Sequence, residues 1–253
     1  MTVKELYKIL NEKIPASLSC EWDNDGLMCC PDGERAVRRA LVALDVTDAV
    51  VDAAIEGEYD VIVSHHPFIF KGLKSINDEN YIAEKAVKLI KSGISVLSFH
   101  TRLDALDGGV NDCLCALLSL ENVSTFGEGN IGRIGDLHAP TSAETLALTV
   151  KEVLGADGVL LAKADKECHR VAVLGGEGGD DIGAAIAAGA DTYISGRLGY
   201  HAMTDAPDMG INLIEAGHFY TENPVCTALL EMIREADPQI DCDIYHSNKI
   251  KLI

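Results

Sequence analysis

The stretch Val61-Ile62-Val63-Ser64-His65-His66-Pro67-Phe68 joins an apolar strand to two adjacent histidines. The branched apolar residues that open it are typical of a buried strand, and Pro67 cannot continue that strand. Because side chains alternate between the two faces of a strand, His65 and His66 cannot both point into one core. Two imidazoles at the carboxyl end of a strand are well placed to bind metal, and we expect them to form half of a two-metal site.

The sequence on both sides of this stretch alternates between short apolar runs and amphipathic segments. Such alternation predicts βαβ units and a largely parallel sheet, in which functional residues gather beyond the carboxyl ends of the strands. The elements expected in this half are helices at residues 2–12, 48–56 (with Thr47 as N-cap) and 80–91 (ending at Gly93), and strands at 40–44, 59–64 and 94–99.

The second half of the chain repeats this order. Asp60 follows Leu41 by 19 residues, and Asp191 follows Val171 by 20. We interpret the match as a diverged internal duplication, which predicts an α/β fold of two similar lobes with the metal site in the cleft between them. The expected lobes are residues 1–125, completed by 223–253, and residues 126–222.

The remaining elements expected from the sequence are less regular. Between residues 121 and 167 the glycine-rich chain predicts one helix, at 142–154, opened by Thr141 or Ser142. Trp22 is expected to anchor a loop over residues 21–27. The other expected elements are a strand at 170–174, a tight turn at 175–179, helices at 180–188 and 221–236, and a last strand at 241–253.

Composition excludes several classes of protein. With 47% hydrophobic residues the chain can form one or two domains with real cores, and its net charge of −19 disfavours binding to nucleic acid or to an anionic membrane. No apolar run approaches the roughly 20 residues of a membrane span, and no signal peptide is recognisable at the start. The eight cysteines form no C-x-x-C pair, so we expect reduced thiols in a cytoplasmic protein.

Four clusters of candidate residues lie at the expected strand ends or beside them. His218 and Glu222 are four residues apart at the start of a helix, so they share one face and can reach one metal centre. Imidazole and carboxylate ligands suit two divalent ions of Zn, Fe, Mn or Co. The clusters are His65 with His66, His100 to Asp104, His201, and His218 to Glu222.

Each cluster also has an ordinary structural interpretation. A lone histidine pair is more often a loop feature, and an isolated His-x-x-x-Glu is more often a surface pair. Asp104 could cap a helix, and His201 could be a satisfied core histidine. The glycine-rich turn at 175–179 lacks the spacing of a phosphate-binding loop. The joint placement of the clusters favours metal binding.

Five sequence blocks resemble the NGG-interacting-factor-three-like family, whose members are often named type 2 GTP cyclohydrolase I. The resemblance covers essentially the whole chain, and its histidine blocks are the specific part. The blocks are Trp22-Asp23-Asn24-Asp25-Gly26-Leu27, Asp45-Val46-Thr47, Ser64-His65-His66-Pro67, His100-Thr101-Arg102-Leu103-Asp104-Ala105 with Gly108-Gly109-Val110-Asn111-Asp112, and Ala216-Gly217-His218 with Glu222.

The resemblance implies a dinuclear metal site between two α/β lobes and a ring-shaped homohexamer. The ligands that it implies are His65, His66, Asp104, His218 and Glu222, with Glu222 bridging the two metals. Two positions depart from the family pattern: Arg102 stands where Asn is usual, and Arg197 follows Ser195-Gly196 where Gly-Asp is usual. These arginines could bind an anionic substrate or neutralise nearby carboxylates.

The expected function is hydrolysis that depends on two metals. Metal ions can activate water as a nucleophile at neutral pH, and His100 and His201 are candidates for proton transfer. The resemblance implies a small anionic substrate, a purine nucleotide such as GTP. A dinuclear phosphoesterase or amidohydrolase would fit the same ligands. The alternative outside the enzymes is a protein that binds or delivers metal or acts as a scaffold.

Overall fold

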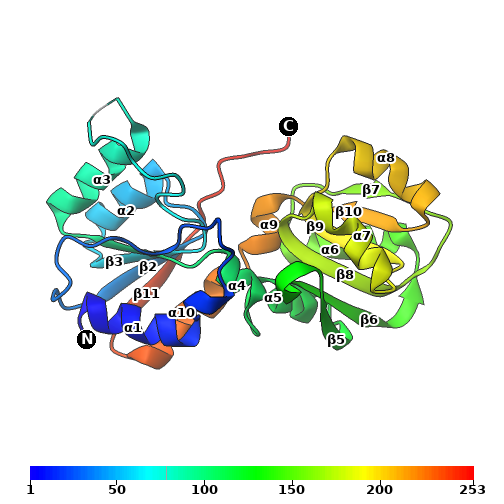
Figure 1. The fold of residues 1–253 in the computed structure, drawn as a ribbon, viewed down its shortest axis with the longest axis horizontal. Helices are drawn as coiled ribbons and strands as arrows, with labels where there is room; N and C mark the ends of the chain where they lie inside the picture. Colours follow the sequence, from blue (N-terminus) through cyan, green and yellow to red (C-terminus); the bar gives the residue numbers. More distant parts are fainter. Residues whose placement is uncertain (78) are drawn as a thin grey trace. The chain divides into compact units, whose positions relative to one another are not determined.

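The chain folds into two compact units, which a computed structural model describes for residues 1–77 and 79–253. Unit 1 comprises Met1–Leu103 and Val225–Asn248, and unit 2 comprises Asp104–Pro224 and Lys249–Ile253. Each unit combines one sheet with helices, so the mixed α/β architecture expected from the sequence is observed (Figure 1). The sequence places the boundary at residue 125, whereas here residues 104–125 belong to unit 2.

The sheet of unit 1 has the order β1-β4-β3-β2-β11 over the described residues. The strands β4, β3, β2 and β11 run parallel to their neighbours, and β1 is an antiparallel edge strand. Because β3 lies at the centre, its carboxyl end is flanked by strand ends on both sides. The strands are β1 (Gly26–Cys29), β2 (Arg39–Ala43), β3 (Val61–Ser64), β4 (Ser95–Ser98) and β11 (Asp241–Tyr245), and the helices are α1 (Val3–Lys13), α2 (Asp48–Glu56), α3 (Tyr81–Ser92) and α10 (Val225–Ala236), while α4 (Thr101–Ala105) leads from unit 1 into unit 2.

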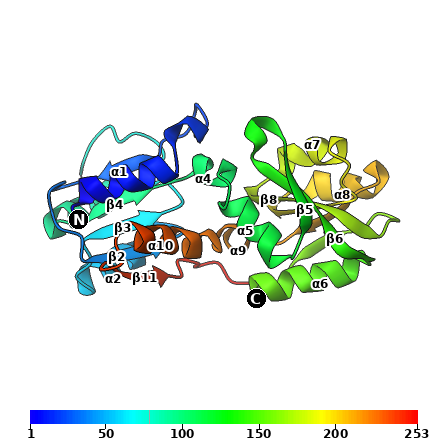
Figure 2. The same cartoon turned by 90° about the horizontal axis from the view of Figure 1, so that it is seen from below.

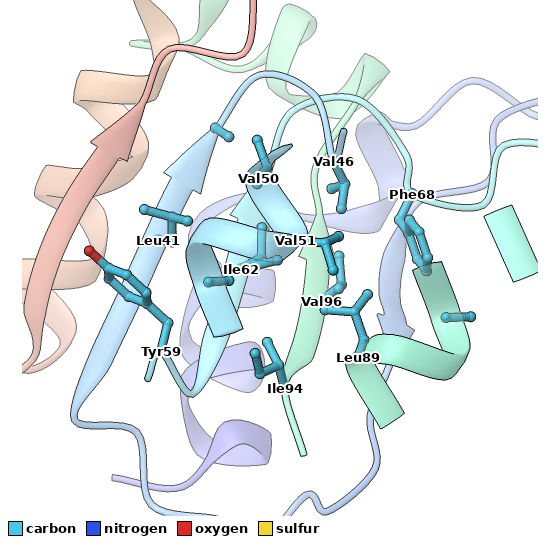
Figure 3. Packing of buried hydrophobic residues seen from close by; sticks show 13 residues of the cluster. Leu41, Val46, Val50, Val51, Tyr59, Ile62, Phe68, Leu89, Ile94 and Val96 are labelled. Carbon is cyan, nitrogen blue, oxygen red and sulfur yellow. The ribbon is translucent and has the colours of Figure 1, made fainter. Parts of the chain in front are cut away.

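One face of the unit 1 sheet is covered by α2 and α3 (Figure 3). Leu41, Ile62 and Val96 of three adjacent strands are buried against Val50 and Val51 of α2 and against α3. These strand positions alternate with residues on the other face, as the period of a strand requires. The packing holds β3 firmly from that side and leaves its carboxyl end to carry polar residues.

The sheet of unit 2 has the order β5-β6-β8-β9-β10-β7 over the described residues. Its strands β8, β9 and β10 are parallel, and β5, β6 and β7 are antiparallel to their neighbours. The strands are β5 (Glu121–Phe126), β6 (Gly132–Thr141), β7 (Leu160–Ala162), β8 (Cys168–Glu177), β9 (Thr192–Arg197) and β10 (Asn212–Glu215), and the helices are α5 (Val110–Leu117), α6 (Ala143–Leu154), α7 (Ile182–Ala187), α8 (Tyr200–Met209) and α9 (His218–Glu222).

Both faces of this second sheet are covered. One hydrophobic cluster joins α5 and α6 to the sheet, and another joins α7 and α8 to it. Figure 2 shows α6 on one side of the sheet and α7 and α8 on the other. A parallel sheet buried on both faces requires apolar residues at successive positions, as in Val171-Ala172-Val173-Leu174 of β8.

Helix ends follow the local chemistry read from the sequence. Thr47 Oγ1 accepts a hydrogen bond from the N–H of Val50 at 3.3 Å, and Ser142 Oγ accepts one from the N–H of Thr145 at 3.1 Å. Gly93 ends α3 with a left-handed φ of 70°. These predicted caps are confirmed.

Several predicted elements are wrong. The helix expected over 221–236 is broken at Pro224 into α9 and α10, because proline cannot donate a backbone hydrogen bond within a helix. The tight turn at 175–179 is in part the end of β8, and the last strand stops at Tyr245. The strands β1, β5, β6 and β7 and the helix α8 were not predicted, because they are short, polar or interrupted by glycine and proline.

Two aspartates occupy matching positions in the two sheets. The Asp60 carboxylate accepts hydrogen bonds from the N–H groups of Arg38 and Arg39, and Asp191 accepts them from His169 and Arg170. The N–H of Asp60 donates to the carbonyl oxygen of Arg39, and the N–H of Asp191 donates to that of Arg170, at 3.0 Å in both units. The same pattern of aspartate hydrogen bonds therefore occurs in the series β2-α2-β3-α3-β4 and in the series β8-α7-β9-α8-β10. A common origin of the two series by duplication stays a prediction.

Replacing Asp60 by asparagine should destabilise unit 1 by about 2 kcal/mol at neutral pH, because its buried carboxylate serves two backbone donors and Arg35. Burial acts to raise the pKa of Asp60, but these donors outweigh it and lower that pKa. The carboxylate therefore stabilises the fold above its unfolded pKa of about 3.9, and this contribution is lost as pH falls through the folded value.

Urea unfolding at several pH values checks this prediction. The difference in unfolding free energy between the wild type and Asp60→Asn should be constant near pH 7 and shrink below about pH 4. Asp52→Asn is the control, because Asp52 is half-exposed in its ion pair with Lys88 and should change stability by less than about 0.5 kcal/mol. An equal loss in both variants would contradict the role given to Asp60.

Among the described residues, no helix is both long and apolar enough to cross a lipid bilayer.

Candidate metal centre

The two histidines that open the site follow β3 directly. The N–H of His66 donates to the carbonyl oxygen of Leu44 at 2.9 Å, and the N–H of Phe99 donates to that of Ser64 at 2.9 Å. Backbone pairing therefore continues just past the strand and fixes the chain from which both imidazoles project. His65 is fully buried and His66 is half-buried.

In three histidines of unit 1, His65, His66 and His100, the ring nitrogen Nδ1 lies within hydrogen-bond distance of an acceptor oxygen. A carbonyl or ionised carboxylate oxygen can only accept, so Nδ1 carries the proton in each ring and the lone pair of the neutral imidazole lies on Nε2. Metal-binding histidines are oriented in this way by outer-shell acceptors. The distances from Nδ1 are 3.0 Å for His65 to the Phe99 carbonyl oxygen, 2.7 Å for His66 to Asp45 Oδ1, and 2.8 Å for His100 to Asp23 Oδ1.

The same three imidazoles converge. Each of His65, His66 and His100 offers a ring nitrogen within 4.8 Å of the other two. The ring centroids are 5.0 Å apart for His65 and His66, 5.3 Å for His65 and His100, and 5.7 Å for His66 and His100. The sequence places His100 beside the site as a proton-transfer group, and that role stays a prediction.

Asp23 fixes the position of His100. Its buried carboxylate accepts from the His100 ring and from the N–H and hydroxyl of Thr101, at 3.0 and 2.6 Å. Burial acts to raise the pKa of Asp23, but the hydrogen bonds from His100 and Thr101 outweigh it and hold that pKa well below its usual range. Asp23 is therefore a stable anion that can support a positive charge on the His100 ring.

Asp23 and Asp45 were given no role from the sequence. Asp45 could have been found, because it follows β2 at the same sheet edge as His66, and carboxylates at such an edge can reach neighbouring strand ends. Asp23 lies in a loop 77 residues before His100, and local sequence carries no signal for that pairing.

Arg102 does not serve as an open anion site. Its side chain is 1% exposed and lies 2.8 Å from Asp25, and it also donates to Asn11 and to the carbonyl oxygen of Ile14. Of the two roles considered for this arginine, the structure fits neutralisation of a carboxylate. Arg197 is exposed, with Glu177 at 3.9 Å.

Unit 2 holds the remaining predicted ligands. His218 Nε2 lies 2.9 Å from Glu222 Oε2, as expected for residues four apart on α9. The carboxylate of Asp104 also offers an oxygen within 4.8 Å of a Glu222 oxygen, and both residues are buried. Two buried carboxylates at this separation repel each other, and a cation between them would remove that repulsion.

Glycines let β8 and β9 approach α9 closely. A side chain at Gly176, where φ is +72°, would place its Cβ only 2.1 Å from Glu222 Oε1. One at Gly196 would meet the backbone of His218 at 2.7 Å. The hydroxyl of Thr221 accepts from the N–H of Gly176 at 3.1 Å. Glu222 thus occupies a cradle that only glycine leaves open.

Asn111 is a further buried residue, and the sequence analysis gave it no role of its own. Its side-chain amide donates to the carbonyl oxygen of Asp104 at 3.2 Å, and its side-chain oxygen accepts from the N–H of Gly175 at 2.8 Å. Asn111 therefore connects Asp104 to the end of β8, next to the Glu222 cradle.

A comparison with known proteins identifies the family of this chain. The profile described as Duf34/NIF3 (NGG1p interacting factor 3) matches residues 1–251. The chain belongs to the Duf34/NIF3 family.

Two curated relatives of this Duf34/NIF3 chain carry different names. A "GTP cyclohydrolase 1 type 2 homolog" of Clostridium acetobutylicum is 34% identical over 244 residues, covering 93% of this chain and 91% of the relative. A "Protein NIF3 homolog" of Schizosaccharomyces pombe is 31% identical over 235 residues, covering 86% and 84%. A crystal structure of a Bacillus cereus protein related to NIF3 has a TM-score of 0.91 at 22% identity, covering 100% and 99%, and shows the shared fold.

His201 lies outside the groups that this Duf34/NIF3 chain gathers among its described residues. It is exposed on α8, with its ring 5.6 Å from that of Tyr200. The interpretation of His201 as a core histidine is therefore wrong, and its part in proton transfer stays a prediction.

The donors present fit a divalent metal. Unit 1 supplies imidazoles whose Nδ1 atoms are each held by an acceptor, and unit 2 supplies one imidazole and two carboxylates. Mixed nitrogen and oxygen donors of this kind suit zinc, iron, manganese or cobalt. These groups are therefore possible metal-binding sites.

Proposed function

We propose that this Duf34/NIF3 protein is a hydrolase that depends on a dinuclear metal centre. The single observation that carries the proposal is the orientation of His65, His66 and His100. In each ring Nδ1 contacts a hydrogen-bond acceptor, which leaves Nε2 on the opposite side of the ring to bind a metal or a proton. His65 and His66 of unit 1 and Asp104, His218 and Glu222 of unit 2 would hold the metal ions, as the family resemblance implies.

The chain's own residues would divide the remaining work. Bound divalent metals lower the pKa of water from 15.7 to about 7 and so supply a nucleophile at neutral pH. His100 would accept a proton at Nε2, since Asp23 holds its Nδ1–H and stabilises the positive ring that results. Asp45 and the Phe99 carbonyl would keep the His66 and His65 rings in place.

The proposed substrate is a small anionic molecule, a purine nucleotide such as GTP. The names of curated relatives support this class. Two divalent cations with two carboxylates leave a formal charge of about +2 at the centre, which would attract phosphates to a chain whose net charge is −19. The expected reaction opens the imidazole ring of the purine and releases formate.

Metal analysis and turnover test the proposal together. Purified protein loaded under aerobic and anaerobic conditions should hold two divalent ions per chain and hydrolyse GTP or another nucleotide of a panel. His65→Ala and Glu222→Gln should abolish that turnover. Activity that survives both substitutions would show that the reaction uses another site, and full metal loading without turnover on any nucleotide would favour a metal-binding protein without this activity.

Replacing Gly176 by alanine should lower metal content without unfolding unit 2. The new Cβ would displace the Glu222 carboxylate, and the positive φ would cost about 1 kcal/mol. Gly155→Ala is the matched control, because it has a φ of +62° and open space around it. Mass spectrometry measures the loss of metal, and urea unfolding measures the loss of stability. Equal metal loss in both variants would contradict the role of Gly176 in making room for the Glu222 carboxylate.

We further propose a homohexamer, as the family resemblance implies. Light scattering coupled to size exclusion should give six times the mass of one chain, and a monomer or dimer at micromolar concentration would exclude it.

A further inference from the structure

Two aromatic side chains stand exposed beside the histidine cluster of unit 1. Trp22, the single tryptophan of the chain, is 65% exposed, and Phe70 is 44% exposed. The expectation that Trp22 anchors a loop over residues 21–27 stays a prediction. The Trp22 and Phe70 rings lie 6.2 Å apart, and they lie 6.2 and 6.1 Å from the ring of His100.

The three rings are nearly perpendicular to one another. The interplanar angles are 80° for Trp22 and Phe70, 75° for Trp22 and His100, and 87° for Phe70 and His100. Such edge-to-face contacts fix each ring through its neighbours and leave outer ring faces in solvent. A planar group could stack on one exposed face and meet the edge of another ring.

The backbone under both rings is held in place. The Asp23 carboxylate accepts hydrogen bonds from His100 and Thr101, and the Cys20 N–H donates to Thr101 Oγ1 at 3.0 Å. The side chain of Asn24 donates to the carbonyl oxygen of Ile69, which ties the Trp22 loop to the Phe70 loop. Phe68 is buried in the core two residues before Phe70. The exposed rings are therefore preorganised on bonded loops.

We propose that Trp22 and Phe70 bind the planar heteroaromatic ring of the substrate by stacking, next to the histidines that bind metal. The inference rests on the proposed function for the place of the metal and adds to it the part of the substrate that is recognised. Exposed aromatic faces that contact a candidate catalytic histidine favour a ring-bearing ligand, since every nucleobase has a π-face for stacking.

The first experiment uses the natural fluorescence of Trp22 in the metal-loaded protein. Guanosine and GTP should quench it in a saturable way, whereas inorganic tripolyphosphate, which lacks a ring, should not. Quenching by guanosine in the absence of any GTP turnover would support the stacking site while the hydrolase proposal fails. No saturable effect of either ring-bearing probe would overturn the inference.

The second experiment measures GTP affinity by calorimetry in ring-deletion variants. Trp22→Ala and Phe70→Ala should each weaken binding by about tenfold or more, with metal content and tripolyphosphate affinity unchanged. Trp22→Phe should restore most of the affinity, because it restores a ring. Tyr81→Ala removes a ring that is 69% exposed on α3 and is the control.

Unchanged GTP affinity in both alanine variants would overturn the inference even if turnover is observed. A change in oligomeric state with unchanged affinity would also overturn it, since the rings would then belong to a contact between copies of the chain.

Discussion

A His65→Ala protein should lose at least one of the two metal ions that we propose the chain binds, and with it all of the proposed metal-dependent hydrolysis. His65 is fully buried, and the Phe99 carbonyl oxygen holds its Nδ1, so Nε2 is the ring atom left to bind a metal, and alanine removes it. Changing an outer-shell partner alone typically costs 10- to 100-fold in metal affinity, and deleting a ligand should cost more. Metal content after dialysis and calorimetric titration with zinc, manganese or cobalt measure the loss.

Two companion variants make this result specific. Asp45→Asn leaves the His66 ring in place but removes the carboxylate that orients it, and should weaken metal binding by about 10- to 100-fold. His138→Ala removes a histidine whose side chain is 91% exposed on unit 2 and should leave metal content unchanged. Two ions per chain in His65→Ala at wild-type affinity would refute the proposed ligand set.

Replacing Arg102 by leucine should destabilise unit 1 by about 3–5 kcal/mol, because it leaves the buried Asp25 carboxylate without its cation. The guanidinium also donates to Asn11 and Ile14, and its central carbon lies 4.8 Å from the ring centre of Phe99. Those contacts connect the start of α4, next to His100, to the carboxyl end of α1, so their loss should also loosen His100.

Trp22 fluorescence reports the unfolding of unit 1 in urea, since it is the single tryptophan and lies in that unit. Lys8→Leu is the control in the same unit, because that side chain is 78% exposed and should change stability by less than about 0.5 kcal/mol. If Arg102 instead bound an anionic substrate, Arg102→Leu would keep its stability and lose only substrate affinity.

The sequence predicts that the histidines lie at the carboxyl edge of the unit 1 sheet, because the alternation of strands and helices determines that edge. Alternating strands and helices imply parallel neighbours, and parallel strands bring their carboxyl ends to one edge, where His65, His66 and His100 are found. The caps at Thr47 and Gly93 were equally local, since each depends on one side chain or one φ angle.

The parts that could not be predicted depend on distant pairings. The strand β5 has a single buried residue, Phe126, so it has no apolar alternation to detect. Arg102 and Asp25 are 77 residues apart, and only the folded chain shows that they share a buried ion pair. The break between α9 and α10 was readable in principle, because Asn223-Pro224 is a helix-ending signal.

Unit 1 is discontinuous in sequence, and this has a consequence for synthesis. Its strand β2 pairs with β11 in the register Asp241 to Arg39, so one edge of β2 finds its partner only after residues 104–224 have left the ribosome. Unit 2 can fold from a nearly continuous segment during that interval, while unit 1 carries an open strand edge. Such an edge invites pairing with other chains, so chaperone demand should concentrate on the nascent protein before α10 and β11 emerge.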